Sequence, residues 1–79
     1  MVKVYSKYNC KYCKQVKRLL KFSGIDYVEI KVEDDAEAFK YVKEELGFSQ
    51  LPVIVATGVE PFQFNSAKVN EFVEGYKHG

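Results

Sequence analysis

The sequence predicts an α/β fold in which four strands form one mixed sheet and three helices cover its faces, in the order β-α-β-α-β-β-α. Short apolar, β-branched runs alternate along the chain with segments whose apolar residues recur every three to four positions. An opening β-α-β unit joins parallel strands through a right-handed crossover. Two strands separated by only a few residues favour an antiparallel hairpin at the end of the sheet.

The first half of the chain supplies two strands and the first helix. The run "VKVYS" predicts a strand at Val2–Ser6, and a helical period then starts at Lys11 and stops at Gly24. The predicted apolar face of this helix consists of Tyr12, Val16, Leu19 and Phe22 or Ser23. The next strand, Tyr27–Val32, alternates so that Val28, Ile30 and Val32 share one face.

The second helix follows an acidic segment. Asp34 and Glu37 have the spacing of a capping box, and the helical period behind them is carried by Ala38, Val42 and Leu46. Gly47 is the expected end of this helix because glycine readily adopts the conformation that closes a helix.

Two strands and a helix complete the chain. The continuous apolar run Pro52–Ala56 is typical of a strand covered on both faces, and Phe62–Phe64 is a short strand after a turn at Gly58. Ser66 is the expected cap of the last helix. The apolar period of that helix is Val69, Phe72, Val73 and Tyr76.

Length and charge limit the classes of protein to consider. The 79 residues predict a single domain spanning residues 1–79, and a hydrophobic fraction of 47% excludes a disordered chain. A net charge of +1 argues against nucleic-acid or membrane binding, although lysines crowd the first quarter of the chain. No stretch resembles a signal peptide or a membrane span, so we expect a cytoplasmic protein, and a monomer.

Cys10 and Cys13 stand at the predicted junction between the first strand and the first helix. In a reducing compartment a Cys-x-x-Cys pair indicates redox or metal chemistry more than a structural staple. Unpaired N–H groups at a helix N-terminus stabilise a thiolate, and Lys7, Lys11 and Lys14 would act in the same direction. We therefore expect Cys10 to be the nucleophile and Cys13 to resolve the mixed disulfide.

Other uses of the pair stay open at this point. The two cysteines could be inert, but their place at a strand–helix junction makes that the weaker interpretation. A structural zinc site needs four ligands, and His78 is the sole histidine, so we expect no zinc. A copper-binding carrier that uses both thiolates is the alternative from another class. Small copper-chaperone domains, however, usually have Met where this chain has Tyr8, and they follow a β-α-β-β-α-β order.

The chain resembles the glutaredoxin branch of the thioredoxin fold over nearly its whole length. The resemblance is carried by the Cys-x-x-Cys that opens a helix, the later "SQLPVIV" segment and the β-β-α end. It implies that Pro52 follows a cis peptide bond and packs beside the active disulfide. It also implies that Leu51 offers backbone hydrogen bonds to a bound peptide or to glutathione.

Within that branch the chain is most similar to NrdH-type redoxins. "LGFSQLPVIVA" resembles their Leu-Gly-Tyr-x-Gln-x-Pro-Val-Val-Val segment, and "GVEPFQFNSAKV" replaces the Gly-Gly-Asp of glutathione-using glutaredoxins. Phe64 matches the Phe of the redoxins' Ser-Gly-Phe-Arg-Pro segment, but Asn65-Ser66 replaces the Arg-Pro. Between the cysteines, Tyr12 matches glutaredoxins and Lys11 stands where they have Pro.

This resemblance implies a thiol–disulfide oxidoreductase that needs no cofactor, because the two sulfurs carry the two electrons. The implied reductant is thioredoxin reductase, and an implied target is ribonucleotide reductase. The alternative within the enzyme class is a glutathione-dependent glutaredoxin. We expect Lys11 to favour the thiolate and Tyr12 either to border the site or to pack on the core, while Lys7 matches both groups.

Overall fold

A computed structural model describes the backbone of residues 2–78 and the side chains of residues 2–76, so the side chain of His78 lies outside the described part. The elements are β1 (Val2–Ser6), α1 (Lys11–Phe22), β2 (Tyr27–Lys31), α2 (Ala36–Lys40), the π-helical turn η1 (Tyr41–Glu45), β3 (Val53–Ala56), β4 (Val59–Gln63) and α3 (Ser66–His78). This is the predicted order, with the second helix divided into an α-helical and a π-helical part.

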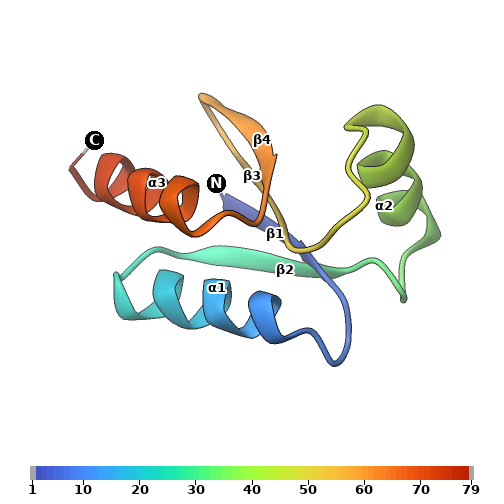
Figure 1. The fold of residues 1–79 in the computed structure, drawn as a ribbon, viewed down its shortest axis with the longest axis horizontal. Helices are drawn as coiled ribbons and strands as arrows, with labels where there is room; N and C mark the ends of the chain where they lie inside the picture. Colours follow the sequence, from blue (N-terminus) through green and yellow to red (C-terminus); the bar gives the residue numbers. More distant parts are fainter. Residues whose placement is uncertain (1, 79) are drawn as a thin grey trace.

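The four strands form one mixed sheet in the order β2-β1-β3-β4. β1 runs parallel to β2 and antiparallel to β3, and β3 is antiparallel to β4. Figure 1 shows α1 and α3 together on one side of the strands and α2 on the other. The predicted thioredoxin-like, glutaredoxin-type architecture is therefore confirmed.

The sheet separates two hydrophobic clusters. Val4 and Ile54 belong to the cluster under α1 and α3, whereas their neighbours Tyr5 and Val53 belong to the cluster under α2 and η1. Successive residues of a strand point to opposite faces, so each central strand contributes to both clusters. This matches the expectation that the apolar run of β3 is covered on both faces.

The buried face of α1 differs from the predicted one. The buried residues are Cys13, Val16 and Leu20, whereas Tyr12 is 48% exposed and Phe22 is 89% exposed. Spacing alone allows a face that begins at Tyr12 as well as one that begins at Cys13, the cysteine expected to be the more buried of the two. Cys13 in fact begins the buried stripe, which turns the inner face of the helix by about one residue.

Both predicted helix caps are wrong by one residue. The Asp35 carboxylate accepts hydrogen bonds from the N–H groups of Glu37 and Ala38, each at 3.1 Å, so Asp35 and not Asp34 caps α2. Asp34 is used elsewhere: its N–H donates to the Lys31 carbonyl in the turn after β2.

At the start of α3, Ser66 is already inside the helix. The Asn65 side-chain oxygen accepts from the N–H groups of Ala67 and Lys68, at 3.0 and 3.2 Å. A side chain caps best from the residue just before the first helical turn, and Asn is among the best caps.

The strand limits also shift. β2 ends at Lys31 and β3 starts after Pro52, while β4 spans Val59–Gln63 and not Phe62–Phe64. The β3–β4 turn is tighter than predicted, because Ala56 already pairs with Val59 and Gly58 adopts a positive φ of 81°. Glycine tolerates this conformation without strain, so the hairpin can close over two residues.

We predict that Leu20→Ala lowers the free energy of unfolding by about 3 kcal/mol, because Leu20 is fully buried on the inner face of α1 and its truncation leaves a cavity. Phe22→Ala, two residues along the same helix, should change it by less than about 0.5 kcal/mol. Urea unfolding of both variants measures this. Equal losses of stability in the two variants would mean that Phe22 belongs to the buried face of the helix, as the spacing predicts.

Candidate active site

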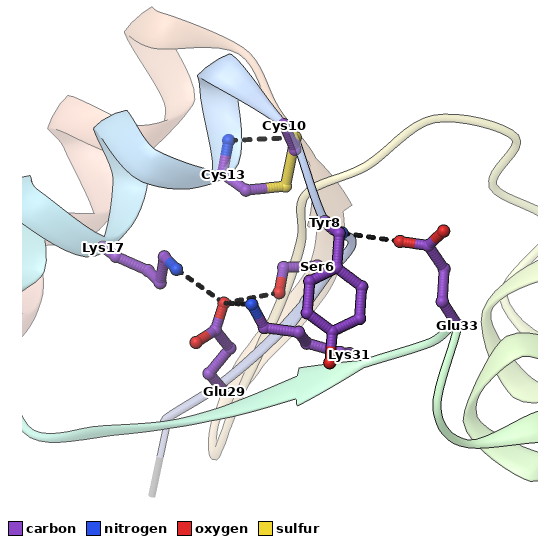
Figure 2. The surroundings of a disulfide bond; sticks show 8 residues. All are labelled: Ser6, Tyr8, Cys10, Cys13, Lys17, Glu29, Lys31 and Glu33. Atoms are coloured by element: carbon purple, nitrogen blue, oxygen red, sulfur yellow. Dashed lines mark hydrogen bonds and ion pairs between the residues drawn. A yellow bond between two sulfur atoms is a disulfide. The ribbon is translucent and has the colours of Figure 1, made fainter.

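The two cysteines occupy the first turn of α1. Their Cα atoms are 5.2 Å apart, and the two sulfurs form a disulfide bond (Figure 2). Cys10 is the N-cap of α1: its sulfur accepts a hydrogen bond from the Cys13 N–H at 3.2 Å. Cys13 is 1% exposed and Cys10 6%, so the first cysteine is the more accessible, in the predicted direction. The arrangement holds a reactive pair whose outer sulfur faces the positive end of a helix.

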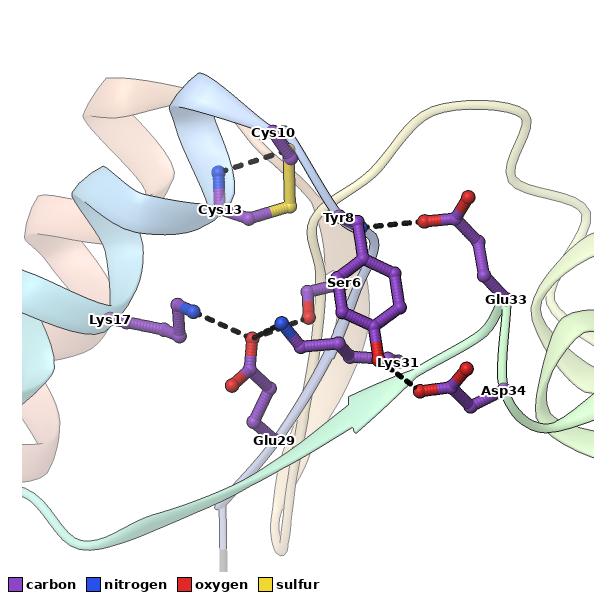
Figure 3. A network of polar contacts seen from close by, with 9 residues as sticks. All are labelled: Ser6, Tyr8, Cys10, Cys13, Lys17, Glu29, Lys31, Glu33 and Asp34. Atoms are coloured by element: carbon purple, nitrogen blue, oxygen red, sulfur yellow. Dashed lines mark hydrogen bonds and ion pairs between the residues drawn. A yellow bond between two sulfur atoms is a disulfide. The ribbon is translucent and has the colours of Figure 1, made fainter.

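The loop between β1 and α1 is held by the loop that follows β2. The Tyr8 N–H donates to the Glu33 carboxylate at 2.6 Å, and the Tyr8 hydroxyl donates to Asp34 (Figure 3). The Lys31 ammonium lies 4.2 Å from the centre of the Tyr8 ring. The hydrogen bond to Asp34 raises the pKa of Tyr8 above its ordinary value. These contacts fix the chain two residues before Cys10.

Asn9 completes the approach to the helix with a φ of +55°. Asn is one of the few residues that adopt the left-handed conformation readily. This turn ends the strand direction of β1 and brings Cys10 into the extended conformation of an N-cap, with φ of −109° and ψ of 113°. The residue before the first cysteine is therefore part of the geometry that sets the sulfur on the helix end.

A polar network lies on the same side of the sheet as the disulfide. The fully buried Ser6 donates its hydroxyl hydrogen to the Glu29 carboxylate at 2.7 Å. Lys17 of α1 approaches the same oxygen at 2.7 Å, and Lys31 lies 4.0 Å from it (Figure 2). The network ties the strand that leads to Cys10, the helix that begins there and the edge strand β2 into one unit.

The Glu29 carboxylate is held in its charged form. Burial acts to raise its pKa, but the hydrogen bonds from Lys17 and Ser6, with the positive charges of Lys17 and Lys31, outweigh burial, so the pKa of Glu29 lies below its ordinary value of 4.5. A half-buried carboxylate with these partners stabilises the fold only while it is ionised.

Tyr12 lies between the cysteines in sequence and stacks on Phe64, with ring centroids 4.7 Å apart and an interplanar angle of 23°. The Phe64 N–H in turn donates to the Pro52 carbonyl at 2.9 Å. Pro52 is buried, and the Leu51–Pro52 peptide bond is cis, as the resemblance implies. Through Phe64, the segment before β3 is connected to the first turn of α1.

The other predicted site residues are less closely connected. Lys11 is exposed, and its ammonium lies 6.0 Å from the centre of the Tyr12 ring. Lys7 is also exposed, and its side chain forms no hydrogen bond or ion pair with the described residues. Leu51 packs against the hydrophobic cluster under α2 and η1. Lys11 and Tyr12 thus lie between the two cysteines in the first turn of α1, and Phe64 connects Tyr12 to Pro52. Lys7 and the Leu51 side chain take no part in these contacts.

The sequence analysis missed the polar network beneath the disulfide. Its members are Ser6, Lys17, Glu29 and Lys31, and the neighbouring contact of Tyr8 with Glu33 was missed as well. One signal was available: Glu29 falls between Val28 and Ile30, which places it on the opposite face of β2, and helices cover both faces of such a sheet. A charged residue at a position that a helix covers should have a partner on that helix.

Two general features of the described residues bear on other functions. No cluster of three or more His, Cys, Asp or Glu side chains that could hold a metal ion occurs within them. None of the helices in the described part is both long and apolar enough to cross a membrane.

Comparison with known proteins gives the family. The sequence profile of the glutaredoxin family matches residues 2–60. The chain belongs to the glutaredoxin family. A glutaredoxin-like 8.6 kDa protein from the rubredoxin operon of Clostridium pasteurianum is 34% identical over 74 residues, which cover 94% of this chain and 99% of that protein. The glutaredoxin-like protein NrdH of Lactococcus lactis is 36% identical over 74 residues, or 94% and 97% of the two chains.

Solved structures agree with this assignment. The glutaredoxin-like NrdH-redoxin of Escherichia coli, described as having a thioredoxin-like activity profile, superposes with a TM-score of 0.79 at 28% identity. The match covers 89% of this chain and 91% of that protein. The predicted resemblance to NrdH-type redoxins is thereby confirmed. The chain is a glutaredoxin-like redox protein whose Cys-x-x-Cys pair lies at disulfide distance.

We predict that Glu29→Gln lowers the free energy of unfolding by about 1 kcal/mol at neutral pH, because it removes the charge that Lys17 and Lys31 face. Since the folded pKa of Glu29 is depressed, its stabilisation is present above the ordinary value of 4.5 and is lost as the pH falls through the lower folded value. The difference between wild type and variant should therefore disappear in acid.

Urea unfolding from neutral to acidic pH measures this difference. Glu44→Gln is the matched control, because Glu44 is exposed and forms no ion pair with the described residues. Its free energy of unfolding should stay within about 0.5 kcal/mol of the wild-type value. A loss in Glu29→Gln that is the same at every pH would contradict the electrostatic account.

Proposed function

We propose that this protein is a small thiol–disulfide oxidoreductase that carries electrons from a reductase to a disulfide in a partner protein. The observation that carries the proposal is the Cys10 sulfur acting as N-cap of α1 while bonded to Cys13 within the same turn. In the reduced protein that position offers a helix N–H and the positive helix end to a thiolate. Both favour ionisation, and a thiolate is the form that attacks disulfides.

The proposed reaction has two exchange steps. The Cys10 thiolate attacks one sulfur of the target disulfide, which forms a mixed disulfide and releases the other target sulfur as a thiolate that takes up a proton. Cys13 loses its proton and attacks the Cys10 sulfur, which breaks the mixed disulfide and forms the Cys10–Cys13 bond. The protein dithiol is thus oxidised by two electrons, and the target disulfide is reduced to two thiols.

The surroundings of the pair support this division of roles. Cys10 is the more exposed sulfur, and Cys13 belongs to the buried face of α1, so an incoming disulfide meets Cys10 first. We assign substrate docking to the Tyr12–Phe64 stack and to the backbone around Leu51 and Pro52, which Phe64 connects to the site. Stacked rings beside a reactive sulfur offer apolar surface to the residues that flank a target disulfide.

The partners follow from the resemblance to NrdH-type redoxins. We propose thioredoxin reductase as the reductant and ribonucleotide reductase as a target, in the reducing cytoplasm where a dithiol of this kind operates. Glutathione is the alternative reductant, because Tyr12 stands where glutathione-using glutaredoxins carry a tyrosine. Supplying the oxidised protein with NADPH and either thioredoxin reductase or glutathione with its reductase decides between the two.

We predict that Cys10→Ser abolishes disulfide reduction, because no thiolate remains at the helix end. Cys13→Ser should still attack but should stop at the mixed disulfide, which no longer has a resolving thiol. Insulin-disulfide reduction measures the first effect, and a mass increase equal to one bound thiol measures the second. Full activity in Cys10→Ser would refute the proposed mechanism. A mixed disulfide that accumulates on Cys13 in that variant would show that Cys13 is the nucleophile.

A further inference from the structure

The exposed side of α1 next to the disulfide carries a row of three cations, Lys11, Lys14 and Arg18, here called the basic ridge. All three are exposed. With Asn9 and Gln15 they line an open hollow of about 450 Å³, which adjoins Cys10 through its two sequence neighbours. The first turn of α1 contains no acidic residue. Any chain that reaches Cys10 from this side therefore meets cationic and neutral polar side chains and no acidic one.

The basic ridge has no counter-charge within the described chain. Lys17, on a neighbouring side of α1, is paired with Glu29 at 2.7 Å, whereas no ion pair of the described residues includes a ridge cation. A solvated helix face is the ordinary explanation for such cations. Here, however, the ridge cations line the hollow beside the reactive sulfur, whereas Lys17, which is turned toward the sheet, is paired with Glu29.

The opposite side of the site has the opposite charge. Glu33 and Asp34 lie beyond Tyr8, away from α1, and both carboxylates are held there by Tyr8 (Figure 3). The surroundings of Cys10 therefore carry cations toward α1, and two carboxylates with Lys31 beside them toward the loop after β2. This asymmetry favours a polypeptide that lies across Cys10 with its acidic part over the basic ridge.

We propose that the basic ridge docks an acidic segment of the disulfide-bearing partner, next to the cysteine that Cys10 attacks. This rests on the proposed function and adds a preference among its targets. Arg18 follows Cys10 by eight residues, which is about 12 Å of helix rise. An extended peptide covers that length in three to four residues. The acidic residues are thus expected about three to four positions from the target cysteine.

A role in stabilising the thiolate does not account for the whole ridge. At about 12 Å, Arg18 lies beyond the Debye length of about 8 Å at physiological salt, so its effect on the Cys10 thiolate is largely screened. A carboxylate that docks directly on Arg18 is not subject to this limit. Charge reversal at Arg18 therefore separates docking from thiolate stabilisation.

The test uses three peptides that differ only in charge. Each has one cysteine activated as a 2-pyridyl disulfide, with Glu, Gln or Lys at the third and fourth positions on one flank, and both flanks are tried. The Cys10 thiolate displaces 2-thiopyridone, Cys13 then releases the peptide thiol, and the absorbance of 2-thiopyridone gives the rate. Rates with dithiothreitol correct for the intrinsic reactivity of each peptide.

The reduced full chain should react about tenfold faster with the Glu peptide than with the Gln peptide at about 0.01 M salt, and the ratio should fall to about one at about 1 M salt. Arg18→Glu alone should lower the rate of the Glu peptide relative to that of the Lys peptide, and Lys14→Glu combined with Arg18→Glu should invert the order of the two peptides. Lys40→Glu combined with Lys68→Glu, on α2 and α3, makes the same change in net charge and should preserve the order.

The outcomes are distinguishable. A Glu-to-Gln ratio near one at low salt, or a ridge variant that slows all three peptides equally, overturns the docking proposal while the proposed function stands. Failure to reduce any peptide overturns the proposed function itself. Salt-sensitive binding of a labelled RNA oligonucleotide that the ridge variant loses, without peptide discrimination, assigns the ridge to nucleic acid instead.

Discussion

The hydrogen bond from the Cys13 N–H to the Cys10 sulfur is the interaction on which the site depends. It makes a sulfur perform the capping task that a hydroxyl or carboxylate oxygen performs elsewhere, and it sets that sulfur at the positive end of α1. The left-handed Asn9 and the contacts of Tyr8 fix the loop that leads to Cys10. The burial of Leu20 fixes the helix that follows it. The fold delivers a strand end and a helix start to the same point.

The charges around this point are segregated by the sheet and the helix. Glu29 neutralises Lys17 on the inner side of α1 and is itself kept ionised there. The cations of the basic ridge form no ion pair with the described residues, and the acids of the loop after β2 are held beyond Tyr8. A single helix thus contributes a structural ion pair on one side and a charged approach to the reactive sulfur on the other.

Much of the fold follows from periodicity, because the strands and helices of this chain have clear apolar patterns. The cysteine site follows from two residues whose chemistry and place at a strand–helix junction are specific. The errors have physical causes: Cys13 served the core as well as the site, and Asp34 was engaged by Tyr8 and left the cap of α2 to Asp35. Contacts between distant segments, such as Ser6 with Glu29 or Tyr12 with Phe64, depend on strand register and helix rotation, which local patterns do not determine.

The most direct test of the account is the thiol pKa of Cys10 in the reduced protein. Ultraviolet absorbance of the thiolate can be followed against pH in Cys13→Ser, which leaves Cys10 as the only thiol. The account predicts a pKa clearly below the value of about 8.5 for a free cysteine, because the helix end and its N–H favour the thiolate. A pKa at or above that value would contradict the claim that the α1 N-terminus activates this sulfur.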